Sequence, residues 1–179
     1  AAAGDKAAQH VVAAAALLAI NVEFCDFRGQ ARWIERFEAG ERAAPHLTRE
    51  LDRLRVDGAR LVLPSLDDRY AHGSVPARAA AQRLFEAIAR GAGPFGDEGL
   101  LLAKALYDHL VMDSDLARCE RLAAFVDERL RSGSAGTAWR WRWAMVQEVA
   151  LDQWGHRTAA VASLREQMAA IVLARPTPS

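Results

Sequence analysis

The chain of 179 residues contains little cysteine and little lysine. Cys25 and Cys119 lie far apart and show no Cys-x-x-Cys or Cys/His spacing, which argues against a disulfide-stapled secreted scaffold and against a zinc site. Buried free thiols in a reducing compartment are the simplest interpretation, with a disulfide between the two as the alternative, so we expect a cytoplasmic protein. Only Lys6 and Lys104 are lysines among 23 basic residues, a composition typical of GC-rich bacterial genomes.

An excess of charge of either sign is also absent, because 23 basic and 23 acidic residues give a formal net charge of zero. Proteins that bind nucleic acid or anionic membranes usually present a basic field, which this composition does not supply. The longest apolar run, from Val11 to Ile20, is too short to span a bilayer, which takes about 20 apolar residues. We therefore expect this segment to contact neither nucleic acid nor membrane.

Long runs of alternating apolar and polar residues are missing as well, whereas apolar residues recur at helical spacing along most of the chain. The sequence therefore predicts an all-α fold. Gly29 is expected to separate two helices and Pro76 to start another. Thr48 and Asp115 are suited to cap helix N-termini. The expected helices are 6–27, 30 to about 42, about 48–63, 76 to about 90, 97–112, 115 to about 131, 137–154 and 156–173.

These helices form four pairs, and a turn sits inside each pair. Counting from Gly29, the turns recur after 45, 40 and 41 residues, at Ser74, Ser114 and Gly155. A fixed period of this size indicates an array of stacked helical repeats. The sequence therefore predicts about four antiparallel helical hairpins in one domain over residues 6–173, with a sub-boundary at the Gly/Pro-rich residues 91–96 and a linker-like tail at 174–179.

Two segments carry a family resemblance. The segment from Leu100 to Phe125 resembles a tetratricopeptide-type repeat: a first helix, a turn at Ser114, and a second helix with a small residue at Cys119. The segment from Trp143 to Met168 repeats that plan with Ala160 as the small residue. Small residues at this place let the two helices of a hairpin approach closely.

The period near forty, together with the Arg-Trp-Arg-Trp sequence at residues 140–143, resembles the helical-repeat domain of large bacterial transcription regulators of the MalT type. Tyr107 departs from the pattern, because it stands where such a repeat usually has a small residue. In that family a nucleotide-binding module precedes the repeats and a helix-turn-helix follows them, and this chain holds neither a P-loop nor a basic recognition helix. The resemblance implies a right-handed solenoid with a regulatory or scaffolding role.

The resemblance also implies that the first helices of the hairpins line a concave face, which holds a peptide, a protein partner or a small-molecule effector. Ordinary solvated helix faces explain the same charges, and an exposed apolar end of the array favours a homodimer as a further alternative. On this alignment the face is offered by Glu23, Asp26, Lys104, Asp108, Arg142, Met145 and Asp152.

The residue patterns that could support catalysis or metal binding have simpler explanations. Asp108, His109, Asp113 and Asp115 bring carboxylates and an imidazole together, but their spacing matches no EF-hand loop, and Asp115 is better explained as a helix cap. No Gly-x-Ser-x-Gly elbow occurs in the chain. We therefore expect a protein that is not an enzyme and carries neither cofactor nor metal.

Three tryptophans cluster at the start of the expected helix 137–154. Trp139 and Trp143 share one helix face. Trp141 points about 160° away from both, since each residue advances about 100° around the helix. Packing of this helix between two neighbours explains two aromatic faces, and a partner-binding groove is the alternative.

The function that the sequence favours is a non-catalytic helical-repeat domain for protein interaction or effector sensing in a bacterial transcription or signalling regulator. The alternative is a compact helical bundle with a buried ligand pocket, either the effector-binding core of another regulator class or a small helical enzyme.

Overall fold

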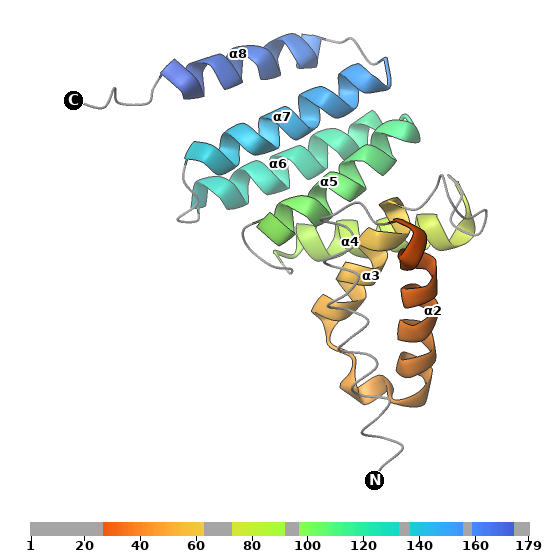
Figure 1. The fold of residues 1–179 in the computed structure, drawn as a ribbon. Helices are drawn as coiled ribbons and strands as arrows, with labels where there is room; N and C mark the ends of the chain where they lie inside the picture. The colour runs from red at the N-terminus through yellow and green to blue at the C-terminus, as the bar shows by residue number, and fades with distance from the viewer. Residues whose placement is uncertain (1–26, 63–72, 92–96, 133–136, 156–158, 174–179) are drawn as a thin grey trace. The chain divides into compact units, whose positions relative to one another are not determined.

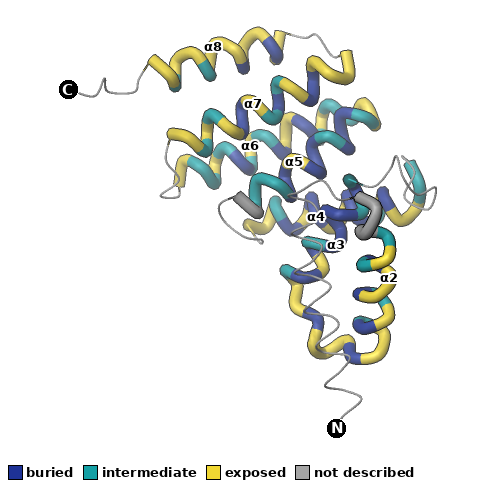
Figure 2. The backbone as a smooth tube through the Cα atoms, viewed as in Figure 1, coloured by how far each residue is buried: buried dark blue, intermediate teal, exposed yellow. Residues whose placement is uncertain are grey.

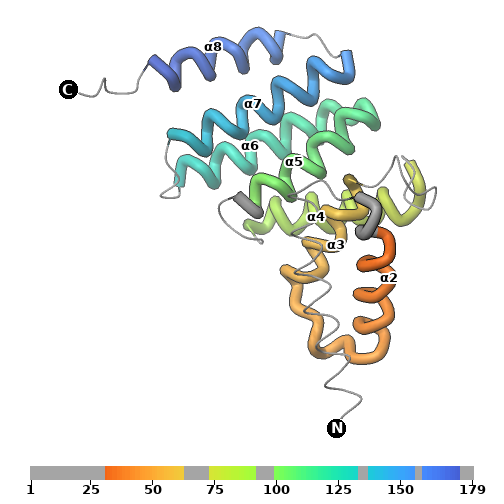
Figure 3. Tube along the Cα trace, viewed as in Figure 1, coloured from red at the N-terminus to blue at the C-terminus, as the bar shows by residue number. Residues whose placement is uncertain are grey.

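The computed structural model describes residues 27–62, 73–91, 97–132, 137–155 and 159–173 (Figure 1). All regular structure in these ranges is helical, so the all-α prediction is confirmed. The chain divides into two compact units, Ala1–His109 and Leu110–Ser179, and α5 contributes residues to both. In chain order (Figure 3) the elements are α2 (Phe27–Ala43), the short 3-10 helix η1 (Pro45–Leu47), α3 (Glu50–Val62), α4 (Val75–Ala89), α5 (Asp97–Met112), α6 (Leu116–Ser132), α7 (Thr137–Gln153) and α8 (Ala159–Leu173).

The later helix boundaries agree with the sequence prediction. The predicted and observed bounds of α5 coincide, and those of α6 and α7 agree to within one residue. Ser114 and Gly155, at two predicted turns, have positive φ angles of 56° and 77°. The Asp115 side chain accepts a hydrogen bond from the Arg118 backbone N–H at 3.1 Å, which confirms it as the α6 N-cap.

Two local predictions in the first unit are wrong. α2 includes Gly29 in its first described turn, so Gly29 does not separate two helices; the cost of a glycine inside a helix, about 1 kcal/mol, is small beside the packing of a long amphipathic helix. The residues before Phe27, and with them almost all of the expected helix 6–27, lie outside the described residues. Thr48 does not cap α3: its backbone N–H closes η1 on the carbonyl of Pro45, and Asp52 accepts instead from the Arg49 backbone N–H at 3.4 Å.

The core of the first unit forms where α3 packs against both α2 and α4. Ile34 and Phe37 of α2 are buried, as are Leu54 of α3 and Leu84 of α4. Buried and exposed faces alternate along these helices (Figure 2), which is the pattern that amphipathic helices show around a shared core.

A buried carboxylate ties three helices of this unit together. The side chain of Asp57, on α3, is only 2% exposed. Arg83 of α4 donates to both of its oxygens, at 2.8 and 2.7 Å, and Arg60 of α3 donates to Oδ1 at 2.7 Å. Arg60 also reaches Glu38 of α2 at 2.6 Å. The network neutralises the buried charge and fixes the three helices in register.

Asp57→Asn is expected to lower the free energy of unfolding by about 3 kcal/mol, because it leaves two guanidiniums facing a neutral, partly buried amide. The matched control is Glu50→Gln on the same helix, which removes the charge from an exposed pair with Arg90 and is expected to cost less than about 1 kcal/mol. Urea unfolding measures both. Equal losses in the two variants would show that the Asp57 network does not hold the unit together.

Gly58 of α3 lies against the Leu102 side chain of α5. A Cβ atom on Gly58 would lie 2.5 Å from Cδ2 of Leu102, a distance at which Leu102 must move. Gly58→Ala, which in an open helix stabilises by about 1 kcal/mol, is therefore expected to destabilise by about 1 kcal/mol here. In a Leu102→Ala background the same substitution is expected to stabilise. A double-mutant cycle in urea tests this, and a stabilising Gly58→Ala in the parent chain would contradict the contact.

In the second unit α7 packs between α6 and α8, and the three helices follow one another side by side (Figure 1). Trp143 is fully buried on α7, while Trp139 and Trp141 are half-buried. The prediction that this helix packs between two neighbours is thus confirmed. α8 is held by a narrow buried face, formed by Val161 and Leu164, and most of its remaining surface is exposed.

Candidate functional site

The seven residues predicted to bind a ligand fall into three groups. Glu23 and Asp26 lie outside the described residues. Lys104 and Asp108 lie one turn apart on α5 in the first unit and form an ion pair with each other. Burial raises the pKa of the Asp108 carboxyl, and Lys104 offsets part of this rise. The remaining three, Arg142, Met145 and Asp152, lie on α7 in the second unit.

The structure brings these three α7 residues onto one exposed face. Steps of three and seven residues separate them, and Val149, which sequence analysis missed, completes the row. Met145 is 37% and Val149 49% exposed, so the centre of the face is apolar. Arg142 lies over the Trp139 ring at 5.4 Å, and Asp152 lies 3.7 Å from Arg165 of α8. We call Arg142, Met145, Val149 and Asp152 the α7 outer face.

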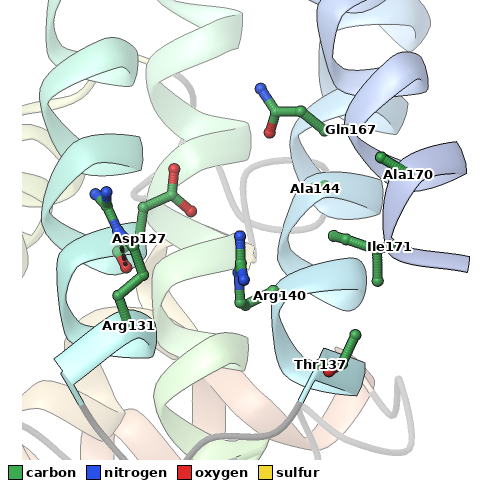
Figure 4. Close-up of a pocket in the computed structure, with 8 residues that line it drawn as sticks. All are labelled: Asp127, Arg131, Thr137, Arg140, Ala144, Gln167, Ala170 and Ile171. Carbon is green, nitrogen blue, oxygen red and sulfur yellow. Dashed lines mark hydrogen bonds between the residues drawn. The ribbon is translucent and has the colours of Figure 1, made fainter. Parts of the chain in front are cut away.

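A cavity of about 550 Å³ lies elsewhere in the same unit, bounded by α6, α7 and α8 (Figure 4). Its charged side chains come from α6 and from the first turn of α7, whereas its apolar side chains come from further along α7 and from α8. We call it the α6–α8 cavity. Its described lining residues are Asp127, Arg131, Thr137, Arg140, Ala144, Gln167, Ala170 and Ile171.

Packing of small residues opens the α6–α8 cavity. Ala144 on α7 and Ala170 on α8 occupy lining positions where larger side chains would fill the space. The two helices are held together beside it, because Arg165 of α8 donates to Glu148 of α7 at 2.7 Å. The side chain of Glu148 is mostly buried, so this pair sits in a less screened environment than an open surface pair.

Two guanidiniums and one carboxylate set the electrostatics of the cavity. Arg131 is anchored by donating its Nε–H to the backbone carbonyl of Asp127 at 3.2 Å (Figure 4). Arg140 forms no hydrogen bond or ion pair with any residue in the described ranges. Burial raises the pKa of the Asp127 carboxyl, and the positive charges of Arg131 and Arg140 counteract only part of that rise.

This raised pKa predicts a pH-dependent gain in stability for Asp127→Asn. A carboxyl group whose pKa is higher in the folded than in the unfolded chain destabilises the fold once pH rises above its folded pKa. The variant is therefore expected to be more stable than the parent at pH 7. The gain should shrink as pH falls through the raised pKa and vanish below about 4, the ordinary range of aspartate.

The test measures the urea unfolding midpoints of the parent chain and of Asp127→Asn between pH 3.5 and 7.5, a range in which buried carboxyl groups titrate. Glu128→Gln is the control, because Glu128 is an exposed carboxylate next to Asp127 on the same helix. A gain that is the same at all pH values, or that Glu128→Gln reproduces, would contradict the assignment.

Sequence analysis missed the charged residues of this cavity. Asp127 and Arg131 are spaced i, i+4 on an amphipathic helix, which is also the pattern of an ordinary surface pair. The available signal was indirect: alanines recur on both expected helices of the last pair, including Ala144 and Ala170, and indicate a thinly packed interface.

The remaining reactive groups have other environments. Cys119 is a buried free thiol, as predicted, and burial next to Asp115 and Glu120 raises its pKa to about 12, so it stays protonated at neutral pH. Cys25 lies outside the described residues. Within the described ranges, no three His, Cys, Asp or Glu side chains are arranged to hold a metal ion.

Comparisons with known proteins add no relative. No protein-family model matches the chain, no curated protein matches it, and no solved structure matches its fold. No helix among the described residues has both the length and the hydrophobicity needed to cross a membrane.

Proposed function

We propose that this chain is a non-catalytic effector-sensing domain, built as a tetratricopeptide-like helical array of a MalT-type bacterial regulator in the cytoplasm, and that it binds a small molecule in the α6–α8 cavity. The observation that carries the proposal is the cavity itself, with its convergent polar groups and its small apolar lining residues.

The size and chemistry of the cavity support ligand binding. Its volume of about 550 Å³ lies within the range of about 300–1,000 Å³ that small-molecule sites occupy. The guanidiniums, the carboxylate, the Gln167 amide and the Thr137 hydroxyl can orient a ligand, while Ala170 and Ile171 offer it apolar surface. Thr137 supplies the one hydroxyl among the described lining residues, and no lining imidazole is there to activate it.

The position of the cavity supports sensing. A ligand inside it contacts α6, α7 and α8 together, and α8 is the helix with the smallest buried face of the three. Binding that bridges Arg140 of α7 and Gln167 of α8 favours the arrangement in which both side chains face the ligand. A ligand that binds one position of α8 more tightly than another shifts the population of the domain toward the tighter-binding position.

The α7 outer face supports a second candidate function, binding of a peptide or protein partner. Its exposed Met145 and Val149 form an apolar centre between the charges of Arg142 and Asp152, an arrangement that suits an amphipathic segment. In a tetratricopeptide-like array, α7 is the first helix of its hairpin and contributes to the concave face. A homodimer through the end of α8, where Leu173 is 84% exposed, is a further alternative.

A pair of tryptophan substitutions on α8 separates these functions. Ala170→Trp places a large ring in the cavity, whereas Ala169→Trp places the same ring on the exposed surface outside its lining. A fragment library screened by ligand-observed NMR is expected to give binders of the parent chain. Ala170→Trp is expected to weaken their affinity tenfold or more, on the order of 1.4 kcal/mol, and Ala169→Trp to leave it unchanged.

Helical circular dichroism and thermal unfolding check that both tryptophan variants are folded. Fragments that bind Ala170→Trp as well as the parent chain would contradict the cavity as the effector site. If Met145→Lys instead abolishes the binding of these fragments, the α7 outer face is the binding site.

A further inference from the structure

We propose that the α6–α8 cavity selects a small organic monoanion, a carboxylate with a short apolar group, whose charge is bound by Arg140 and Arg131. This inference rests on the proposed function, since it names the ligand class for the same cavity.

The charges that line the cavity do not balance. Arg131 and Arg140 contribute two positive charges and Asp127 one negative charge, which leaves one positive charge in excess among the described lining residues. Glu128 is the next acidic group of α6, but it lies 3.9 Å from Arg131 and is largely solvent-exposed, so it screens Arg131 only weakly. A ligand with a single negative charge neutralises this excess, whereas a cation adds to it.

Arg140 is the group that most directly favours an anion. It points between α6 and α7, and none of the described residues accepts a hydrogen bond from it or forms an ion pair with it (Figure 4). Its guanidinium therefore keeps its donors available for a planar carboxylate, which it can bind through two parallel hydrogen bonds. Such a ligand completes the cavity without displacing an internal partner of Arg140.

The backbone adds a weaker contribution of the same sign. Thr137, the first residue of α7, lines the cavity, so the N-terminal end of this helix lies at the cavity wall. The first four N–H groups of a helix have no partner within the helix, and they carry partial positive charge. An anion beside Arg140 is within the first turn of α7, where this contribution is largest.

The charged and the apolar side chains of the lining are separated in space. Figure 4 shows Asp127 and Arg131 on α6 and Arg140 between α6 and α7, whereas Ala170 and Ile171 lie on α8, which also carries the Gln167 amide. A ligand that places its carboxylate near the guanidiniums therefore directs its remaining atoms to the apolar wall. This separation favours an amphiphilic organic anion over an inorganic one.

Asp127 restricts the charge of the ligand. Its half-buried carboxylate opposes a second negative charge, and the partial burial that raises its pKa also reduces the screening of this repulsion by solvent. A dianion is therefore bound less well than its charge alone suggests. A zwitterion, with an ammonium group placed against Asp127, is the competing ligand class that the experiment must exclude.

Three probes of similar size and different charge test the inference: 3-phenylpropionate, 3-phenylpropan-1-ol and 3-phenylpropylammonium. Titrations of the full chain by calorimetry at pH 7 and low salt are expected to show the carboxylate binding at least about tenfold more tightly than the alcohol, and the ammonium binding most weakly. Inorganic phosphate, which lacks an apolar group, is expected to bind more weakly than the carboxylate.

Variants assign the effect to the cavity. Arg140→Gln is expected to weaken carboxylate binding by roughly five- to fiftyfold and to leave the alcohol unchanged, and Arg140→Lys to restore part of the loss. Asp127→Asn is expected to tighten carboxylate binding about two- to tenfold, because it removes a negative charge from the site. Arg118→Gln is the control, since Arg118 belongs to the same unit and does not line the cavity.

Each other result overturns the inference. Equal affinity for carboxylate and alcohol, no binding of the carboxylate at about 10 mM, or an unchanged preference in Arg140→Gln excludes charge selection by this cavity. Weaker carboxylate binding in Asp127→Asn, together with tight binding of phenylalanine, which is a zwitterion at pH 7, identifies the zwitterion as the ligand class. If neutral fragments bind and Ala170→Trp abolishes their binding, the proposed function survives without the anion; if no compound of any charge enters the cavity, the proposed function fails as well.

Discussion

The packing of α7 against both α6 and α8 is the constraint on which the second unit depends. α7 buries Trp143 completely and must also bury Ala144, Gln147 and Leu151, which takes neighbours on more than one side. Because Ala144 and the facing Ala170 are small, the same packing that shields Trp143 leaves a cavity open further toward the start of the helix. The candidate site is thus a product of where large and small side chains fall along one buried helix.

The two units use different means to hold their helices. In the first, the buried Asp57 carboxylate draws guanidiniums from two positions, and Gly58 allows α5 to approach α3 closely through Leu102. In the second, the Glu148–Arg165 pair links α7 to α8.

The accuracy with which the sequence predicted each element depended on local signals. α5, α6 and α7 were predicted nearly to the residue, because Asp115, Ser114 and Gly155 carry recognisable cap and turn chemistry. The break at Gly29 was wrong, since Gly29 lies within α2 and a single glycine costs little beside the packing of the apolar face that Ile34 and Phe37 form further along this helix. Three residues of the α7 outer face were named from the family resemblance. The cavity was not predicted, because it depends on which face of α8 meets α7, and no local pattern around Asp127 or Arg140 encodes that contact.

The most direct measurement of the central claim, that the α6–α8 cavity is a ligand site, is methyl NMR on the chain labelled at alanine and isoleucine. Titration with 3-phenylpropionate is predicted to shift the Ala144, Ala170 and Ile171 methyl signals together, while the Ala77 and Ala80 signals of the first unit stay unchanged. Shifts confined to other methyl groups, with these three unmoved at saturation, would contradict the claim.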